Sequence, residues 1–249
     1  MRMDPETHFS LELGFTHAFE EDSGRGHGTI APELCVPGTA FPHAAVLLTF
    51  ADSATGMLAG LATAPQVAVT VDFRLRIVRQ PPFGPFESET RILRTGRTLT
   101  VGETVFVTAG DPAPFAVALG TFVASPRPAD EQPGHVEAAR SRPQRPILSV
   151  PFTERVALEI LEPGVGEVVL REDLTNSTGT IQGGVLAILG EMAAHTLASA
   201  GSDRTFVVDD LDIRYLRAAR VGPARSGARL LSVDGDRATA EVEMRDTGM

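Results

Sequence analysis

The sequence of 249 residues contains no tryptophan, one tyrosine and one cysteine, and all 22 of its basic residues are arginine. A single cysteine, Cys35, excludes an internal disulfide framework. Its setting among Val, Pro and Leu is typical of an inert structural thiol, not of a nucleophile. The core must therefore be built from Val, Leu, Ala, Ile and Phe. The use of arginine in place of lysine throughout is typical of bacterial genes rich in G and C.

The charge and hydropathy exclude several classes of protein. The net charge is −10 and the pI about 5.1, whereas binding to nucleic acid requires a basic face. With 43% hydrophobic residues, the chain is too apolar to be disordered. The first residues lack the apolar region of a signal peptide, and no uninterrupted apolar run reaches the length of a membrane span. We therefore expect a cytoplasmic protein that binds neither nucleic acid nor membranes.

A break in composition divides the chain. Residues 125–146 are rich in Pro, Arg and Glu and nearly free of large apolar side chains, as is typical of a linker. We expect an N-terminal domain at 1–126, a linker at 127–146 and a C-terminal domain at 147–249. Both halves have an ordinary domain size.

The two halves repeat one order of elements. Helices are expected at 44–62 and 184–200, preceded by strands at 11–20, 29–36, 152–161 and 166–174. Later strands are expected at 67–78, 87–94, 98–108 and 115–124, and at 206–216, 224–233 and 238–245. These strands are too closely spaced for crossover helices, which predicts an α+β fold with antiparallel sheets. The strand at 115–124 has no counterpart in the second half. Either another segment fills that place, or the chain is shorter than the functional protein.

The repeat extends to single residues in the helices. Residues 43–52 align with 182–191, which places Asp52 and Glu191 at equivalent positions. Asp52 is the only charged residue between Phe41 and Val71, and Glu191 is the only one between Thr178 and Ser202. A lone carboxylate on an uncharged helix face indicates a surface covered by a ligand, a domain or a partner. Burial disfavours its ionised form, and such a carboxyl group can act as a general base or nucleophile.

The start of the second helix offers a complementary group. Helix starts have unpaired N–H groups with a partial positive charge, and glycine permits close approach to them. The pair Gly183-Gly184 could therefore stabilise the developing oxyanion of a substrate carbonyl. The alternative interpretations are a glycine-rich loop and a solvated helix charge.

The pattern Asn176-x5-Gln182-Gly183-Gly184-x6-Glu191 resembles the motif of hotdog-fold acyl-CoA thioesterases of the phenylacetate-pathway and 4-hydroxybenzoyl-CoA types. The resemblance implies two tandem hotdog domains, each an antiparallel sheet around one long helix, that form an intrachain pseudo-dimer. It implies hydrolysis of an acyl-CoA or acyl-carrier thioester without a cofactor or metal. Further homo-oligomerisation is compatible with it.

The resemblance also implies roles for individual residues. Asp52 and Glu191 would be nucleophile or general base, the Gly183 amide would polarise the carbonyl, and Asn176 would orient water or the carboxylate. Each site would cross the pseudo-two-fold axis. One would pair Asp52 with Asn176, Gln182 and Gly183, and the other would pair Glu191 with His43 and Ala44.

The first half departs from the motif. Pro37 replaces the Asn or Gln, Ala44-Ala45 replaces the glycine pair, and Gln182 replaces the usual His of the second half. The Asp52 site is therefore expected to matter more than the Glu191 site.

The acyl pocket is expected between the helices, lined by residues such as Leu48, Thr55, Ala59, Met192 and His195, and Gly184 is expected to bind the substrate at the start of the second helix. Two alternatives stay open, a non-catalytic acyl-thioester binder and a hotdog hydratase or dehydratase.

Overall fold

The computed structural model describes residues 9–20, 22–128 and 148–248. In the first half, α1 (Phe9–Glu12), β1 (Thr16–Phe19) and β2 (Ser23–Ile30) precede the long helix α2 (Ala44–Thr63). The strands β3 (Gln66–Ile77), β4 (Gly84–Thr95), β5 (Thr100–Thr108) and β6 (Asp111–Pro128) follow. The second half has α3 (Phe152–Arg155), β7 (Glu159–Glu162), β8 (Val165–Val168) and α4 (Gly183–Ser199), then β9 (Asp210–Arg214), β10 (Ala224–Asp234) and β11 (Arg237–Asp246). Short 3-10 helices at Pro32–Leu34 and Glu172–Leu174 precede the two long helices.

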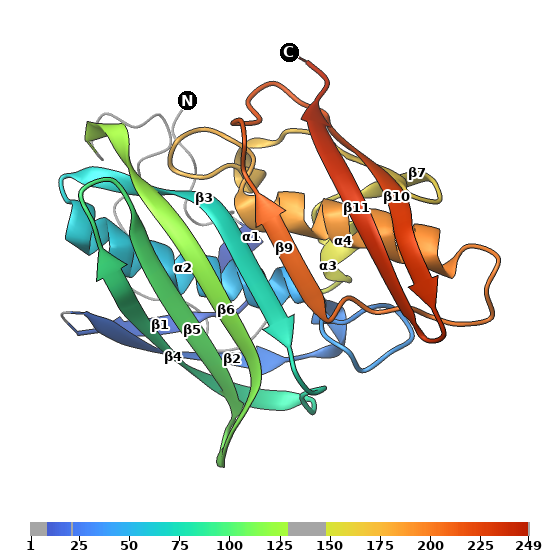
Figure 1. Ribbon diagram of the computed structural model, residues 1–249, viewed down its shortest axis with the longest axis horizontal. Helices are drawn as coiled ribbons and strands as arrows, with labels where there is room; N and C mark the ends of the chain where they lie inside the picture. Colours follow the sequence, from blue (N-terminus) through green and yellow to red (C-terminus); the bar gives the residue numbers. More distant parts are fainter. Residues whose placement is uncertain (1–8, 21, 129–147, 249) are drawn as a thin grey trace.

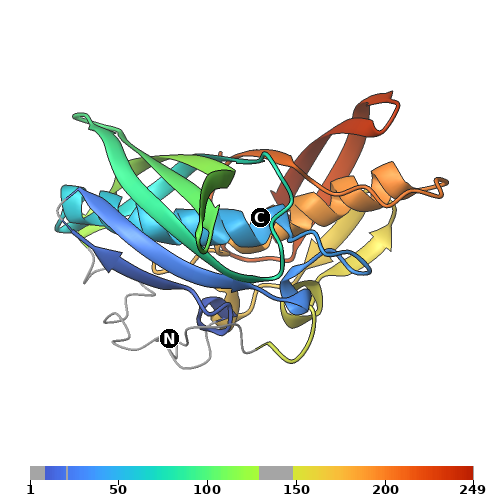
Figure 2. The same ribbon diagram turned by 90° about the horizontal axis from the view of Figure 1, so that it is seen from below.

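Two antiparallel sheets are each wrapped around one helix (Figures 1 and 2). The first sheet has the order β1-β2-β4-β5-β6-β3-β9, and the second has the order β11-β10-β8-β7. The seventh strand of the first sheet, β9, comes from the second half and pairs with β3 in the register Phe73↔Ile213. The two halves therefore share one sheet, and the predicted α+β fold is confirmed.

The residues at the ends of the long helices explain where they begin and end. Pro65 follows α2 closely and cannot continue a helix. The side chain of Gln182 accepts a hydrogen bond from the N–H of Gly184 and caps α4, and Gly201, with φ 71°, follows its end. By length and composition alone α2 could cross a membrane, although Asp52 interrupts its apolar run. However, 67% of it is buried inside the domain, which is typical of a core helix.

The beginning of each half was predicted wrongly. The segments 11–20 and 152–161 begin with the short helices α1 and α3 and form strands only at β1 and β7. These helices bring Phe9 and Phe152 together, with ring centroids 5.9 Å apart and both side chains fully buried. Arg155 of the second half also binds Glu12 of the first, at 2.6 Å. Contacts between the halves therefore override the local strand pattern.

The core of the first half is aromatic. Phe50 of α2 meets the rings of Phe15, Phe86 and Phe106 at centroid distances of 4.8, 5.1 and 5.4 Å. All four side chains are buried, which fixes α2 against its sheet. Cys35 is also buried, and this burial raises the pKa of its thiol to about 11. The thiol is therefore protonated and unreactive near neutral pH.

The linker prediction falls mostly outside the described residues. Strand β6 runs to Pro128, past the expected boundary at residue 126, and residues 129–147 are not described. The domain limits at 126 and 147 therefore stay a prediction.

Candidate active site

The helices α2 and α4 meet through their N-terminal halves. The N–H of Ala45 donates to the Glu191 carboxylate at 2.7 Å. Further along α2, Thr49 lies so close to Gly184 that a Cβ atom on Gly184 would be 1.9 Å from the Thr49 hydroxyl. As the residue number rises in one helix it falls in the other, so the helices cross antiparallel. The first turns of each helix therefore face the middle of the other.

Glu191 is fully engaged at this crossing. Its Oε1 atom lies 2.8 Å from Nδ1 of His43, and its Oε2 atom accepts the Ala45 N–H. The side chains of His43 and Glu191 are 0% and 1% exposed. The structure thus brings Glu191 to His43 and to the start of α2, but this carboxylate has no access to solvent. It accepts the hydrogen bond of the Ala45 N–H, which a thioester carbonyl would otherwise accept.

Asp52, the counterpart of Glu191, is arranged differently. Its Oδ1 atom accepts a hydrogen bond from the hydroxyl of Thr70 on β3 at 2.7 Å. Burial raises the pKa of Asp52 to about 6, and the Thr70 hydrogen bond opposes part of that shift. The residue as a whole is partly exposed, although its carboxyl group is buried deeply enough for desolvation to dominate its pKa. A carboxyl group with such a pKa is ionised at neutral pH and still basic enough to accept a proton.

Tyr215 connects Asp52 with the start of α4. Its hydroxyl donates to the carbonyl of Gly183 at 3.1 Å, and burial together with the charge of Asp52 raises its pKa well above the usual value. Tyr215 is therefore a neutral hydrogen-bond donor. Within residues 9–20, 22–128 and 148–248, the N–H of Gly183 has no hydrogen-bond partner, whereas that of Gly184 binds Gln182. The Gly183 amide is therefore available to an oxyanion.

Other residues predicted for the site have different contacts. The Oδ1 atom of Asn176 accepts from the N–H groups of Thr178 and Thr180, which shapes the loop before α4. Ala44 is fully buried. Thr55 is 0% exposed and faces the sheet, where a Cβ atom on Gly102 would be 3.0 Å from its methyl group. The expectation that Thr55 lines a pocket between the helices is therefore corrected.

His195 lies one turn after Glu191 on α4. Its Nδ1 atom lies 2.6 Å from the carbonyl oxygen of Phe206. This contact fixes the imidazole against the segment that leads to β9, and His195 is not among the residues that line the cavity described next.

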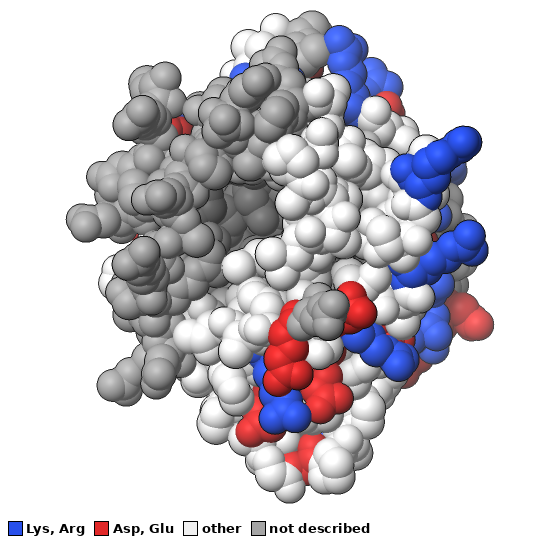
Figure 3. Space-filling model, turned by 90° about the vertical axis from the view of Figure 1, so that its left-hand side faces the viewer, with Lys and Arg blue, Asp and Glu red and all other residues white. Residues whose placement is uncertain are grey.

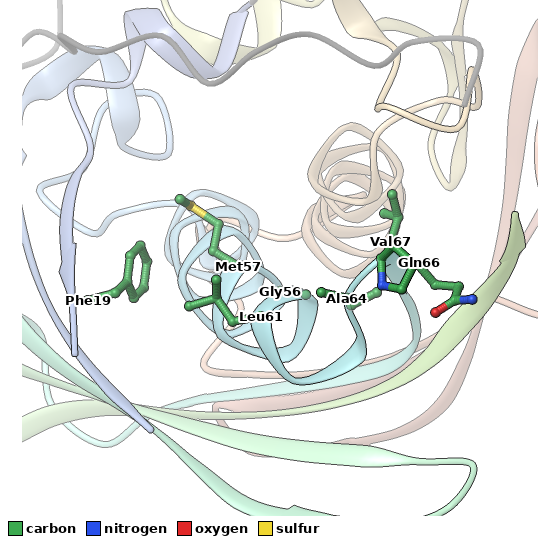
Figure 4. Close-up of a pocket in the computed structure, with 10 residues that line it drawn as sticks. Phe19, Gly56, Met57, Leu61, Ala64, Gln66 and Val67 are labelled. Carbon is green, nitrogen blue, oxygen red and sulfur yellow. The ribbon is translucent and has the colours of Figure 1, made fainter. Parts of the chain in front are cut away.

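A cavity of about 680 Å³ opens beside the C-terminal half of α2. Its lining comes from β1, from α2 and from the start of β3: Phe19, Gly56, Met57, Gly60, Leu61, Ala64, Pro65, Gln66, Val67 and Ala68. Figure 4 shows Phe19 on one side of the space and Met57 and Leu61 on the other. No lining residue is charged, and the described surface at this end of the molecule has a broad area without charged residues (Figure 3).

The cavity begins one helical turn beyond Asp52. Gly56 lies four residues after Asp52, on the same face of α2. Ala68 lies two residues before Thr70, on the same side of β3. Two elements thus lead from the carboxylate into an apolar space, which could take an acyl chain. We expected the pocket between the two helices. The cavity instead lies beyond Asp52 along α2, so this expectation is corrected.

Sequence reasoning did not identify Thr70, Thr49 or Tyr215. Tyr215 is the only tyrosine of the chain, which was a usable signal. The two threonines had none, because their role depends on which elements pack beside α2.

The fold and this crossing of helices define a pseudo-dimer of hotdog domains. A family model described as "Thioesterase superfamily" matches residues 41–113 and 178–249, more than half of the chain in two copies. The chain therefore belongs to the thioesterase superfamily.

A solved structure shares this fold over most of the chain, and two others match about half of it. A protein of Novosphingobium aromaticivorans assigned as a thioesterase is 16% identical, with a TM-score of 0.61 over 94% of this chain and 92% of that one. A mutant thioesterase of Pseudomonas aeruginosa is 21% identical, with a TM-score of 0.43 over 46% and 84% of the two chains. A thioesterase of Haemophilus influenzae is 18% identical, with a TM-score of 0.42 over 46% and 80%. No curated protein matches the sequence.

Proposed function

We propose that the protein hydrolyses an acyl thioester, acyl-CoA or acyl carrier, at a single site built from Asp52 and the start of α4. The observation that carries this proposal is the contrast between the two helix carboxylates. Asp52 is half-buried, has a pKa of about 6 and lies next to an apolar cavity. Glu191 is buried and has two hydrogen bonds.

In the proposed reaction, the acyl chain occupies the part of the cavity beside Gly56 and Ala68, which lie on the Asp52 side. The thioester carbonyl oxygen accepts the free N–H of Gly183. The Asp52 carboxylate removes a proton from water as the water oxygen attacks the carbonyl carbon. The negative charge that develops on the carbonyl oxygen is stabilised by the Gly183 amide and the positive end of the α4 dipole.

The tetrahedral intermediate then collapses. The carbon–sulfur bond breaks, and the thiolate receives the proton held by Asp52, which yields a carboxylic acid and a thiol. The neutral Tyr215 holds the start of α4 in place through the Gly183 carbonyl. In this scheme Glu191 and His43 hold the helices together and do not contact the substrate.

A non-catalytic thioester-binding protein is the second candidate. The observation in its favour is that the Oδ1 atom of Asp52 is already bound to Thr70, and Asn176 is bound within its own loop. A binder and a hydrolase differ in turnover, so one assay separates them.

The test measures free thiol released from a panel of acyl-CoA thioesters with short, long and aromatic acyl groups. We expect turnover of at least one apolar thioester, and a loss of about 100-fold or more in kcat for Asp52→Asn. The exposed carboxylate Asp234 provides a matched control, and Asp234→Asn should retain full activity. Binding without turnover in the wild-type protein would support the second candidate.

A further inference from the structure

The cavity beside α2 has a floor of small residues that begins next to Asp52. Gly56, Gly60 and Ala64 follow Asp52 at intervals of four residues, so the four residues form one line along the helix. The three small residues all line the cavity. Figure 4 shows Gly56 and Ala64 on the side of α2 toward Val67. The cavity therefore extends along α2 in the direction that leads away from the carboxylate.

Packing within the protein does not explain the two glycines of this floor. Glycine is unfavourable inside a helix, because it loses more conformational freedom on folding than other residues. A Cβ atom on Gly60 would meet no atom within 4 Å, and one on Gly56 would lie 3.4 Å from the ring of Phe122, an ordinary contact. Alanine would therefore fit at both positions. Glycine provides space there for a molecule that lies against the main chain of α2.

The second half fills the corresponding places with larger side chains. The alignment of the two halves gives three pairs of corresponding residues: Gly56 and His195, Gly60 and Ser199, and Ala68 and Phe206. Nδ1 of His195 lies 2.6 Å from the carbonyl oxygen of Phe206, and the hydroxyl of Ser199 accepts the N–H of Phe206 at 3.4 Å. These contacts tie α4 to the segment that leads to β9. The space beside α2 is therefore not inherited from the repeat, and residues particular to the first half create it.

The helix geometry sets the length of chain that fits this space. With a rise of about 1.5 Å per residue, Gly60 lies about 12 Å beyond Asp52 along α2, and Ala64 about 18 Å beyond it. An extended chain advances about 1.2 Å per bond, one third of the span of an extended residue. A linear acyl chain with its carbonyl at Asp52 would thus reach Gly60 with about ten carbons and Ala64 with about fifteen. An aromatic acyl group would end near Gly56.

We propose that the substrates are thioesters of linear, uncharged acyl chains with about ten to fifteen carbons, and that Gly60 determines this specificity. The chain lies along α2 from Gly56 to Ala64. No charged residue lines the cavity, so a carboxylate at the end of the chain would lose its hydration there without a cationic partner. This inference rests on the proposed function, because it uses Asp52 to place the thioester carbonyl.

The test compares butanoyl-, dodecanoyl- and benzoyl-CoA as substrates of the full chain, with release of free thiol as the readout. We expect kcat/KM to be about 100-fold higher for dodecanoyl-CoA than for butanoyl-CoA, because its further methylene groups leave water. Gly60→Leu should lower the ratio of these two values by about 10-fold or more, and Gly60→Ala should lower it less. Dodecanoate provides a readout without catalysis, and its Kd, measured by calorimetry, should rise about 10-fold in Gly60→Leu.

Ala62→Leu is the matched control. Ala62 is exposed on α2 and is not among the residues that line the cavity, so the same side chain is added to the same helix outside the path of the acyl chain. We expect Ala62→Leu to retain the substrate ratio of the wild type. Leucine is a better helix former than glycine, so the melting temperature of Gly60→Leu should not fall below that of the wild type. A loss of selectivity at an unchanged melting temperature excludes a folding defect as its cause.

The inference and the proposed function fail in different ways. If the wild type hydrolysed butanoyl-CoA or benzoyl-CoA at least as well as dodecanoyl-CoA, the inference would be wrong and the proposed function would stand. If no thioester were hydrolysed but dodecanoate bound, and Gly60→Leu weakened that binding, the cavity would bind acyl chains and the proposed function would be wrong. Equal effects of Gly60→Leu and Ala62→Leu would overturn the role of Gly60. The absence of both hydrolysis and dodecanoate binding would overturn both proposals.

Discussion

Replacing Glu191 should reduce the stability of the protein and leave its chemistry intact. The carboxylate accepts two hydrogen bonds at 2.8 and 2.7 Å where the side chains are at most 1% exposed. A hydrogen bond to a charged group contributes about 1.5–3 kcal/mol, and removing one partner of a buried pair costs about 3–5 kcal/mol. Glu191→Ala should therefore lower the free energy of unfolding by about 3–5 kcal/mol.

Glu191→Gln provides the intermediate case. The glutamine oxygen can still accept one of the two hydrogen bonds, and the side chain keeps its volume. The loss should be about half as large, on the order of 2 kcal/mol. Urea unfolding should be followed by far-UV circular dichroism, because the chain has no tryptophan to report on it. Turnover per folded molecule of Glu191→Gln should stay within about 3-fold of the wild type, a difference of less than 1 kcal/mol.

The opposite pattern would refute this reasoning. If Glu191→Gln unfolded at the same urea concentration as the wild type and had no activity, Glu191 would be the catalytic carboxylate. The assignment of chemistry to Asp52 would then be wrong.

Four further predictions concern the Asp52 site and the helix crossing. The value of kcat/KM should rise with pH and reach half its plateau near pH 6, because Asp52, with a pKa of about 6, must be ionised; a flat profile from pH 5 to 7 would contradict this. Folding raises this pKa from 3.8 to about 6, so the wild type loses stability as the pH rises from about 4 to 6. Asp52→Asn avoids that loss. Its advantage in urea unfolding should be small at pH 4 and reach about 2–3 kcal/mol at pH 8, and the reverse order would exclude the burial argument. Gly184→Ala should lower the free energy of unfolding by about 1–3 kcal/mol, because the new Cβ would meet Thr49. Gly227→Ala, where a Cβ would have no atom within 4 Å, should lower it far less. Equal losses would count against the close helix crossing. Tyr215→Phe should lower kcat and leave the midpoint of urea unfolding nearly unchanged, because it removes only the hydroxyl that holds Gly183. An unchanged kcat would show that this contact is dispensable.

The helices and their carboxylates could be predicted from the sequence. The repeat and the hydropathy pattern placed helices at 44–62 and 184–200, and the structure has them at Ala44–Thr63 and Gly183–Ser199. The isolation of Asp52 and Glu191 on uncharged faces is a local property of the sequence, so it was visible without coordinates.

Tertiary structure decided how the two equivalent carboxylates differ. Glutamate is one methylene longer than aspartate, and at this helix crossing Glu191 reaches the Ala45 amide, whereas Asp52 bonds to Thr70 on its own sheet. That difference depends on the distance between two helices and on which strand lies beside them, which no local pattern contains. The same holds for the cavity, whose lining comes from three elements, and for the starts of the halves, where the contact of Phe9 with Phe152 favours helix over strand. Sequence thus determined where the carboxylates are, and packing across the pseudo-two-fold axis decided the environment of each.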